Sequence, residues 1–361
     1  MRQDVLDALS GKFPSMVPCK ESLNHPDLVR RVSGIDAYQD TPRALATAWE
    51  RLGIDIHAWI TDQAKAPVVP GGSWRTGTTW YSDMGIFPTA VPREPWQDMD
   101  TSSPEWVYRH DPSRDDIDVE AQARELCAAN HAFRARFGAK AVHYHLYYTT
   151  LFMWAVVKLG WEGFMTAAAL DPLRFDRHFW QPWTEISRKH VEASSRVDEE
   201  ILFLHDDLVM ATGPVFAPSF YETYIFPRYP YILEPARRAG KKLVLVTDGN
   251  CDAFLERLLG LPFDGLMYEN PATPFHRVLE TWGKAGRGFI GGIETAKLTG
   301  GTPEQVYQHT REVLSAGRAF PGFMIASCGG IHGNIPMANL EAYFMARSEA
   351  GIPADLDGAR A

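Results

Sequence analysis

The chain has 361 residues, of which 45% are hydrophobic and 22% charged, as in an ordinary globular protein. Its formal net charge is -9 and it has no dense basic patch, so we expect no nucleic-acid partner. It has no apolar run near the roughly 20 residues that cross a bilayer and no signal-peptide core, so we expect no membrane partner.

Two helices and a strand are predicted before residue 60. Residues 1–10 are typical of a short amphipathic helix, and residues 17–20 of a first strand. Helix 41–52 follows, because Thr41 suits the N-cap and Pro42 suits the first helical position.

A long irregular segment follows at about residues 66–112. It is rich in proline, glycine and tryptophan, and a second strand is predicted within it at 78–83. Segments of this length usually carry function or cover a site. We therefore expect it to be an elaborated loop region over the mouth of the fold.

The remaining chain alternates amphipathic stretches with short apolar runs. Helices are predicted at 119–137, 154–170, 171–197, 218–239, 251–259, 302–316 and 337–347. Further strands are predicted at 141–148, 201–207, 242–249, 265–269, 288–293 and 322–328. Eight strands alternating with helices predict a single α/β domain over residues 1–361, a (β/α)8 TIM barrel with an N-terminal helical extension. A doubly wound open sheet is the alternative.

Polar side chains lie at or near the ends of several predicted strands. They are Asp83, His143, His145, His205, Asp206, Asp207, Asp248, Glu269, Cys328 and the nearby His332. A barrel gathers its strand ends around one mouth, so their joint occurrence favours a site. Alternation along the strand at 141–148 places His143 and His145 on one face. Taken singly, each residue is more often structural than catalytic, since a strand-end aspartate such as Asp248 often caps the next helix.

Carboxylates and imidazoles crowded at one mouth repel one another unless something compensates. Either some of these groups keep a proton through a raised pKa, or the site binds a cation. A borderline metal could use Cys328 as a thiolate with histidine and carboxylate partners, although no H-x-x-x-H motif is present. Both alternatives remain open.

The C-terminal half contains several short motifs. They are H-D-D-L at 205–208 with G-P at 213–214, the stretch 239–250, G-G-I-E at 291–294 with G-T-P-E at 301–304, and C-G at 328–329 with N-I-P at 334–336. Together these segments resemble the uroporphyrinogen decarboxylase superfamily. Order and spacing hold over about residues 200–347. The resemblance implies a (β/α)8 barrel with its site at the C-terminal mouth.

The resemblance implies one of two chemistries, decarboxylation or methyl transfer. True decarboxylases carry R-Q-A-G-R near the first strand, but residues 16–22 here read M-V-P-C-K-E-S. Zinc methyltransferases carry H-x-C-G on the fifth strand, but residues 246–249 here read V-T-D-G, and only Cys328 matches the remaining cysteine. A zinc site would then be a mixed one of Asp248, Glu269 and Cys328.

The leading hypothesis is a methyltransferase that moves a methyl group from a small methylated substrate to a corrinoid, folate or thiol acceptor. We expect Asp207, Asp248 and His205 to be catalytic. The expected substrate-binding residues are His145, His143, Asp206, Glu269, His332 and Asp83. Two alternatives stay open: a cofactor-independent decarboxylase of a non-porphyrin acid, and a non-catalytic corrinoid or tetrapyrrole binding protein.

Zinc, a corrinoid and tetrahydrofolate are the candidate cofactors, and a decarboxylase would need none. The sequence shows no corrinoid domain, so a separate corrinoid protein is a candidate partner, as is a second copy of the chain in a homodimer. The four cysteines are widely spaced with no C-x-x-C, which favours a reducing cytoplasm.

Overall fold

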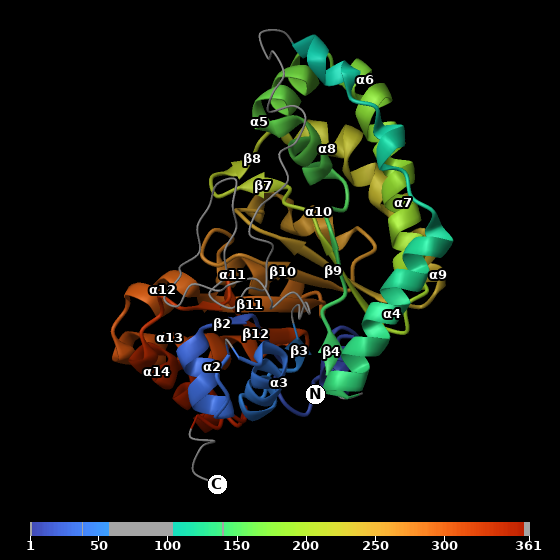
Figure 1. Ribbon diagram of the computed structural model, residues 1–361. Helices are drawn as coiled ribbons and strands as arrows, with labels where there is room; N and C mark the ends of the chain where they lie inside the picture. The colour runs from blue at the N-terminus through green and yellow to red at the C-terminus, as the bar shows by residue number, and fades with distance from the viewer. Residues whose placement is uncertain (1, 38, 58–103, 139–140, 357–361) are drawn as a thin grey trace. The chain divides into compact units, whose positions relative to one another are not determined.

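The computed structural model describes residues 2–37, 39–57, 104–138 and 141–356 (Figure 1). The chain divides into two compact units, and each is described by itself. Unit 1 comprises residues 1–92, 133–144 and 267–361, and unit 2 comprises residues 93–132 and 145–266. The predicted strand at 78–83, Asp83 and most of the irregular segment lie outside the described residues. The organisation as a single domain stays a prediction.

Unit 1 is built on short parallel strands. In spatial order they are β4 (Val142–His143), β3 (Ile56–His57), β1 (Cys19–Glu21), β12 (Phe323–Cys328) and β11 (Gly288–Glu294). The division between the units falls within β10 (Gly265–Tyr268), which is next in order after β11. Strands β11 and β12 are apolar and buried along nearly their whole length, as expected for parallel strands covered on both faces.

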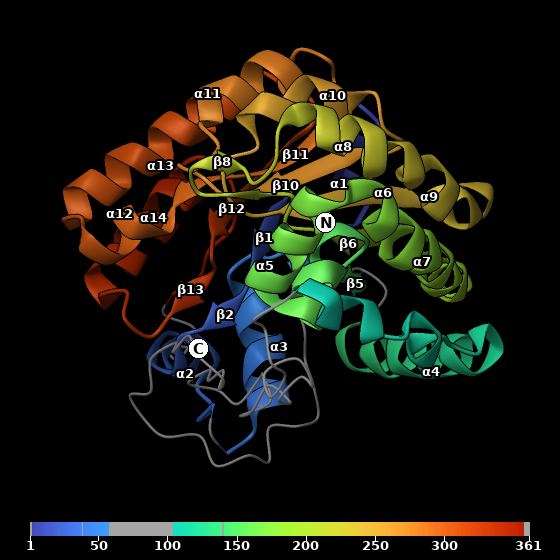
Figure 2. The same cartoon turned by 90° about the horizontal axis from the view of Figure 1, so that it is seen from above.

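Helices alternate with these strands. They are α1 (Arg2–Ala8), α2 (Pro26–Ser33), α3 (Thr41–Arg51), α11 (Phe275–Val278) continued by a π-helix (Leu279–Gly283), α12 (Thr295–Gly300), α13 (Pro303–Gly317) and α14 (Met337–Glu349). Strands β2 (Leu23–Asn24) and β13 (Ile331–His332) form a separate parallel pair. Helices α13 and α14 pack side by side, as the orange and red ribbons of Figure 2 show.

Two helix starts test the predicted caps. Thr302 caps α13 as predicted, in a reciprocal capping box with Gln305. The predicted cap of α3 is wrong by one position, because Asp40 and not Thr41 is the N-cap. The Asp40 carboxylate accepts a hydrogen bond from the backbone N–H of Arg43.

Unit 2 carries three adjacent parallel strands, β5 (Leu146–Tyr148), β6 (Ile201–His205) and β9 (Lys242–Thr247). An antiparallel hairpin of β7 (Val209–Met210) and β8 (Gly213–Pro214) follows β6. The helices are α4 (Val119–Phe137, whose last turn belongs to unit 1), α5 (Phe152–Leu170), α6 (Pro172–Phe175), a π-helix (Asp176–Trp180), α7 (Gln181–Ser195), α8 (Pro218–Tyr224), α9 (Tyr229–Arg238) and α10 (Leu255–Leu259). Short 3-10 helices lie at Pro104–Arg109, Pro112–Asp115, Phe226–Arg228 and Asp252–Phe254. None of the described helices is both long and apolar enough to cross a membrane.

The predicted third strand at 141–148 is two strands that belong to different units. His143 in β4 pairs with His57 in β3, whereas Leu146 in β5 pairs with Phe203 in β6. The prediction of one continuous strand is therefore wrong, and the alternation that placed His143 and His145 on one face does not run through both residues. The sequence pattern also missed β3, which is only two residues long.

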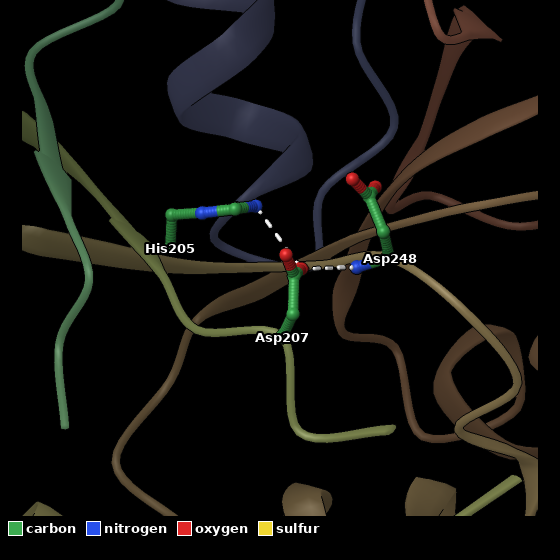
Figure 3. Close-up of side chains that lie close together, drawn as sticks. All are labelled: His205, Asp207 and Asp248. Atoms are coloured by element: carbon green, nitrogen blue, oxygen red, sulfur yellow. Dashed lines mark hydrogen bonds and ion pairs between the residues drawn. The ribbon is translucent and has the colours of Figure 1, made fainter. Parts of the chain in front are cut away.

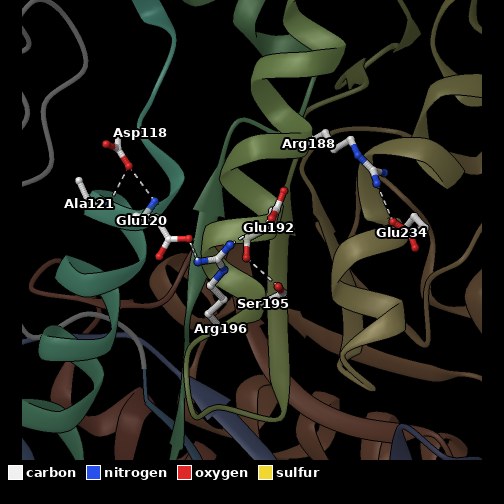
Figure 4. A network of polar contacts seen from close by, with 8 residues as sticks. All are labelled: Asp118, Glu120, Ala121, Arg188, Glu192, Ser195, Arg196 and Glu234. Carbon is white, nitrogen blue, oxygen red and sulfur yellow. Dashed lines mark hydrogen bonds and ion pairs between the residues drawn. The ribbon is translucent and has the colours of Figure 1, made fainter.

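Ion pairs link three helices of unit 2 (Figure 4). Arg196, at the end of α7, pairs with Glu120 of α4 and, at 3.1 Å, with Glu192 of α7. Arg188 of α7 pairs with Glu234 of α9 at 2.7 Å. Pairs this exposed contribute about 1 kcal/mol or less each, so they add little to the stability of the helix packing.

Candidate functional site

Three chemically active side chains meet at the carboxyl ends of β6 and β9. His205 is the last residue of β6, Asp207 lies two residues further on, and Asp248 directly follows β9. One possible ligand atom from each lies within 4.8 Å of the others, so one histidine and two aspartates form a close cluster (Figure 3). The two strands are adjacent and parallel, with His205 opposite Val246, so their ends lie at the same edge.

The Asp207 carboxylate joins the other two residues. Its Oδ1 atom lies 3.1 Å from Nε2 of His205 and accepts a 2.8 Å hydrogen bond from the backbone N–H of Asp248. Figure 3 shows Asp207 between its two neighbours, directed toward both. His205 is only 6% exposed, whereas Asp248 is exposed, so the cluster is buried at one end and open at the other.

The electrostatics of the cluster favour a charged imidazole. Burial lowers the pKa of His205, but its hydrogen bond to Asp207 and the negative charges of Asp207, Asp248 and Asp206 outweigh burial and raise this pKa above its ordinary value. A proton on the ring would thus be held by Asp207 beside an exposed second carboxylate.

An aromatic residue that sequence reasoning did not assign to the site also belongs to it. The Tyr148 ring stacks on His205 with centroids 4.4 Å apart and remains half exposed. Burial, with the charges of Asp207 and Asp248, raises the pKa of its hydroxyl to about 12, so it stays a neutral phenol. Its position at the end of β5, next to β6, was the signal that could have found it.

The turn after Asp248 depends on a glycine. Gly249 has a φ of +81°, and a Cβ there would lie 2.8 Å from the carbonyl oxygen of Val209 and 2.9 Å from the carbonyl carbon of Met210. The next residue, Asn250, donates its backbone N–H to the oxygen of Met210 at 2.9 Å. The β7–β8 hairpin and this turn therefore fix where Asp248 lies.

Asp206 is turned away from the cluster and is fully buried. Its carboxylate accepts hydrogen bonds of 2.8–2.9 Å from the backbone N–H groups of residues 151–153 and one of 2.7 Å from the Tyr229 hydroxyl. Burial raises its pKa to about 6, and these donors act in the opposite direction. These contacts give Asp206 a structural role, that of holding the start of α5, and its predicted contact with substrate stays a prediction.

The two earlier histidines lie outside the cluster. His143 is half-buried in unit 1, where its ring stacks on Phe133 at 4.2 Å. His145 is buried in unit 2, and burial, with a smaller effect of Lys241, lowers its pKa to about 4. Their predicted contacts with substrate stay predictions.

The other predicted site residues belong to unit 1. Glu269 follows β10, Cys328 ends β12 and donates its thiol hydrogen to the carbonyl oxygen of Tyr268 at 3.4 Å, and His332 ends β13. Burial, with the charge of His25, lowers the pKa of His332. The predicted metal ligands Asp248, Glu269 and Cys328 come from different units and stay a prediction.

The chain is similar to known proteins in family and in fold. Residues 161–350, more than half of the chain, match the family model described as uroporphyrinogen decarboxylase (URO-D). A solved methyltransferase from Methanosarcina mazei is 15% identical with a TM-score of 0.60, covering 96% of this chain and 98% of that chain. A Penicillium canescens endo-1,4-beta-xylanase, XylE, is 15% identical over 60% of this chain and 76% of its own, but its TM-score of 0.36 supports no argument. No curated protein sequence matches the chain.

These similarities agree with the predicted fold class. At 15% identity, the similarity to the Methanosarcina protein shows the fold alone. That fold is α/β, with parallel strands alternating with helices in the manner of a TIM barrel, and the predicted fold class is confirmed. In such folds the carboxyl ends of the strands carry the active site, which is where the cluster of unit 2 lies.

Proposed function

Because the chain belongs to the uroporphyrinogen decarboxylase family, we propose that it is a methyltransferase-type enzyme acting on a small methylated substrate. The cluster of His205, Asp207 and Asp248 is the observation that carries this proposal. It offers an acid that can protonate a leaving group and carboxylates that can hold positive charge, at strand ends where barrels react. The structural neighbour described as a methyltransferase supports the same class.

The chain's own residues would act as follows. The methyl carbon leaves its heteroatom for the acceptor's nucleophile, and the heteroatom keeps the electron pair of the broken bond. His205 supplies the proton that this heteroatom needs, and Asp207 holds the ring in position at 3.1 Å. Asp248, the exposed carboxylate, faces the cationic part of the substrate. The half-exposed ring of Tyr148 offers an apolar surface for a methyl or aromatic group.

The cofactors, acceptor and partners are proposals of the same kind. A zinc–thiolate site on β9 does not fit, because Val246 and Asp248 stand where the resemblance requires histidine and cysteine. A mixed set of Asp248, Glu269 and Cys328 remains an alternative. A corrinoid delivered by another protein, tetrahydrofolate or a thiol would take the methyl group. None of the four cysteines forms a disulfide, which supports the proposed cytoplasmic location.

The test is a matrix of methyl donors and acceptors. Purified full-length protein is incubated with O-, N- and S-methyl compounds, each with cob(I)alamin, tetrahydrofolate or a simple thiol, and methylated acceptor is measured by mass spectrometry. We expect transfer with at least one pair, and a loss of about 100-fold or more in Asp248→Ala, the usual range for an acid–base or charge-holding group.

The matched control is Glu256→Gln, which removes an exposed carboxylate from α10 of the same unit and should leave transfer unchanged. The proposal fails if no pair reacts, or if Asp248→Ala is as active as the parent. Release of carbon dioxide without an acceptor would support decarboxylation instead. A corrinoid absorption spectrum without turnover would support a binding protein.

A further inference from the structure

We infer that His205, Asp207 and Asp248 form a binding site for one divalent cation, with one imidazole and two carboxylate ligands. This deepens the proposed function and rests on it for the cation's role in the reaction. With the ion bound, His205 and Asp248 would be its ligands, and the ion's Lewis acidity would take the place of the proton from His205 and of the charge held by Asp248. Cation binding itself rests on the geometry of unit 2. The site differs from the predicted set of Asp248, Glu269 and Cys328, since it uses no thiolate and lies wholly within one unit.

The spacing suits a single ion. Two ligand atoms that each lie roughly 2.1 Å from one ion are at most about 4.2 Å apart. The three candidate atoms already lie within 4.8 Å of one another, and His205 and Asp207 are in direct contact at 3.1 Å. The 4.8 Å bound exceeds this limit of about 4.2 Å by roughly 0.6 Å, and Asp248 is the exposed member of the set, whose side chain can rotate toward an ion.

The buried part of the site is held in place by its surroundings. His205 is stacked on Tyr148, and the Asp207 carboxylate is held by the backbone of Asp248. Preorganised ligands lower the cost of binding an ion. The exposed side of the cluster leaves coordination positions for solvent or substrate, as catalytic metal sites do.

The imidazole is arranged to present one nitrogen to the cluster. Its Nε2 atom faces Asp207, while its Nδ1 atom is buried without a hydrogen-bond partner among the described residues. A cation at the cluster would take the lone pair of Nε2, and the ring would keep its proton on Nδ1.

The negative charges of the two carboxylates also favour a bound cation. Asp207 and Asp248 bring two negative charges to one small region, and a protonated His205 cancels only one of them. A divalent ion cancels both. One imidazole nitrogen and two carboxylate oxygens suit ions such as Zn²⁺, Mn²⁺, Fe²⁺ or Co²⁺ better than thiolate-seeking Cu⁺. Once bound, the ion would supply Lewis acidity toward the heteroatom of the methyl donor.

The test is direct cation binding, with no substrate present. Full-length protein is treated with a chelator, dialysed and titrated with Mn²⁺, and the free ion is followed by electron paramagnetic resonance. We expect one Mn²⁺ per chain, and at least 10-fold weaker binding in Asp207→Asn and in Asp248→Asn. Glu256→Gln should bind as the parent does. Circular dichroism verifies that each variant folds. If Asp207→Asn does not fold, Asp248→Asn still tests the site, because Asp248 is exposed.

Cobalt distinguishes the two ligand sets. Bound Co²⁺ should show ligand-field bands without a thiolate charge-transfer band, and Cys328→Ser should leave the spectrum unchanged. A thiolate band that Cys328→Ser abolishes would overturn the inference, as would no binding or unchanged affinity in both aspartate variants. Binding as expected, with no methyl transfer from any donor, would sustain this site and reject the proposed function. Methyl transfer by protein that binds no cation would sustain the proposed function and reject this cation site.

Discussion

Two adjacent aspartates have different roles that their local sequence does not distinguish. Asp206 and Asp207 follow the same strand, and nothing in the sequence separates them. In the structure the Asp206 carboxylate is buried at the start of α5, whereas the Asp207 carboxylate faces His205 and Asp248. The sequence could indicate that acids gather at this strand end. It could not show the backbone partners that divide their roles, because Leu151 lies 55 residues from Asp206 and Asp248 lies 41 residues from Asp207 along the chain.

His57 is a residue whose burial makes stability depend on pH. It is 6% exposed, its ring lies 4.5 Å from that of Trp49, and its Nε2 is 2.8 Å from the carbonyl oxygen of Ile54. Burial is the main cause that lowers its pKa to about 4, from 6.5. The unfolded chain therefore binds a proton between these pH values where the folded chain does not, so acid favours unfolding.

We predict that His57 stabilises the fold fully above pH 6.5 and that this contribution is lost as pH falls to about 4. The loss is about 3 kcal/mol at most, from 1.36 kcal/mol per pKa unit. Urea unfolding of the parent and of His57→Gln between pH 4 and 8 measures it. The difference between the two proteins, which removes the effect of other histidines, should shrink toward low pH. A constant difference would contradict the assignment.

Gly249 gives a second residue-scale prediction. Gly249→Ala should destabilise the protein by more than Gly240→Ala, because both glycines have positive φ but only Gly249 would place its Cβ against backbone atoms. Strained φ alone costs about 1 kcal/mol, and the collision adds to it. Thermal unfolding of both variants gives the comparison. Equal losses would show that the hairpin does not constrain the turn after Asp248.

At the scale of elements, helix α5 depends on a residue far from it in sequence. Its N-cap residue, Leu151, offers no side-chain cap, and Asp206 supplies the acceptor from the end of β6 instead. Helix starts leave backbone N–H groups that need acceptors. The sequence predicted this helix from its apolar pattern but could not show what starts it.

We predict that Asp206→Ala destabilises the protein by about 3 kcal/mol or more, because it leaves several buried donors without an acceptor. Tyr229→Phe, which removes one donor and keeps the carboxylate, should cost about 1–2 kcal/mol. Denaturant unfolding gives both values. If Asp206→Ala kept its stability but raised KM for a methyl donor, the predicted contact with substrate would be right and the structural role wrong.

Strands were predicted well where they are long and apolar. The interiors of β6, β9, β11 and β12 all lie within predicted runs, since burial on both faces leaves a plain signal. The two-residue β3 has no such signal. The break between β4 and β5 was missed because a change of pairing partner at His143 leaves no trace in the local pattern.

At the scale of the whole molecule, fold class and family could be predicted from the sequence. The order and spacing of a few motifs carried the prediction, although the sequence is only 15% identical to the solved methyltransferase. The match over residues 161–350 covers the same region as the motifs that carried the resemblance. The candidate site could be predicted only in part. His205, Asp207 and Asp248 were predicted as catalytic, and the structure brings them together, but their proposed use as cation ligands in place of Glu269 and Cys328 needed the geometry.

Anomalous diffraction from crystals grown with equimolar Zn²⁺ or Co²⁺ is the most direct test that these three residues are the centre. We predict one strong peak within bonding distance of His205 Nε2 and of the carboxylates of Asp207 and Asp248, absent in Asp248→Asn. A single peak at Cys328 and Glu269, with none at His205, would contradict the account.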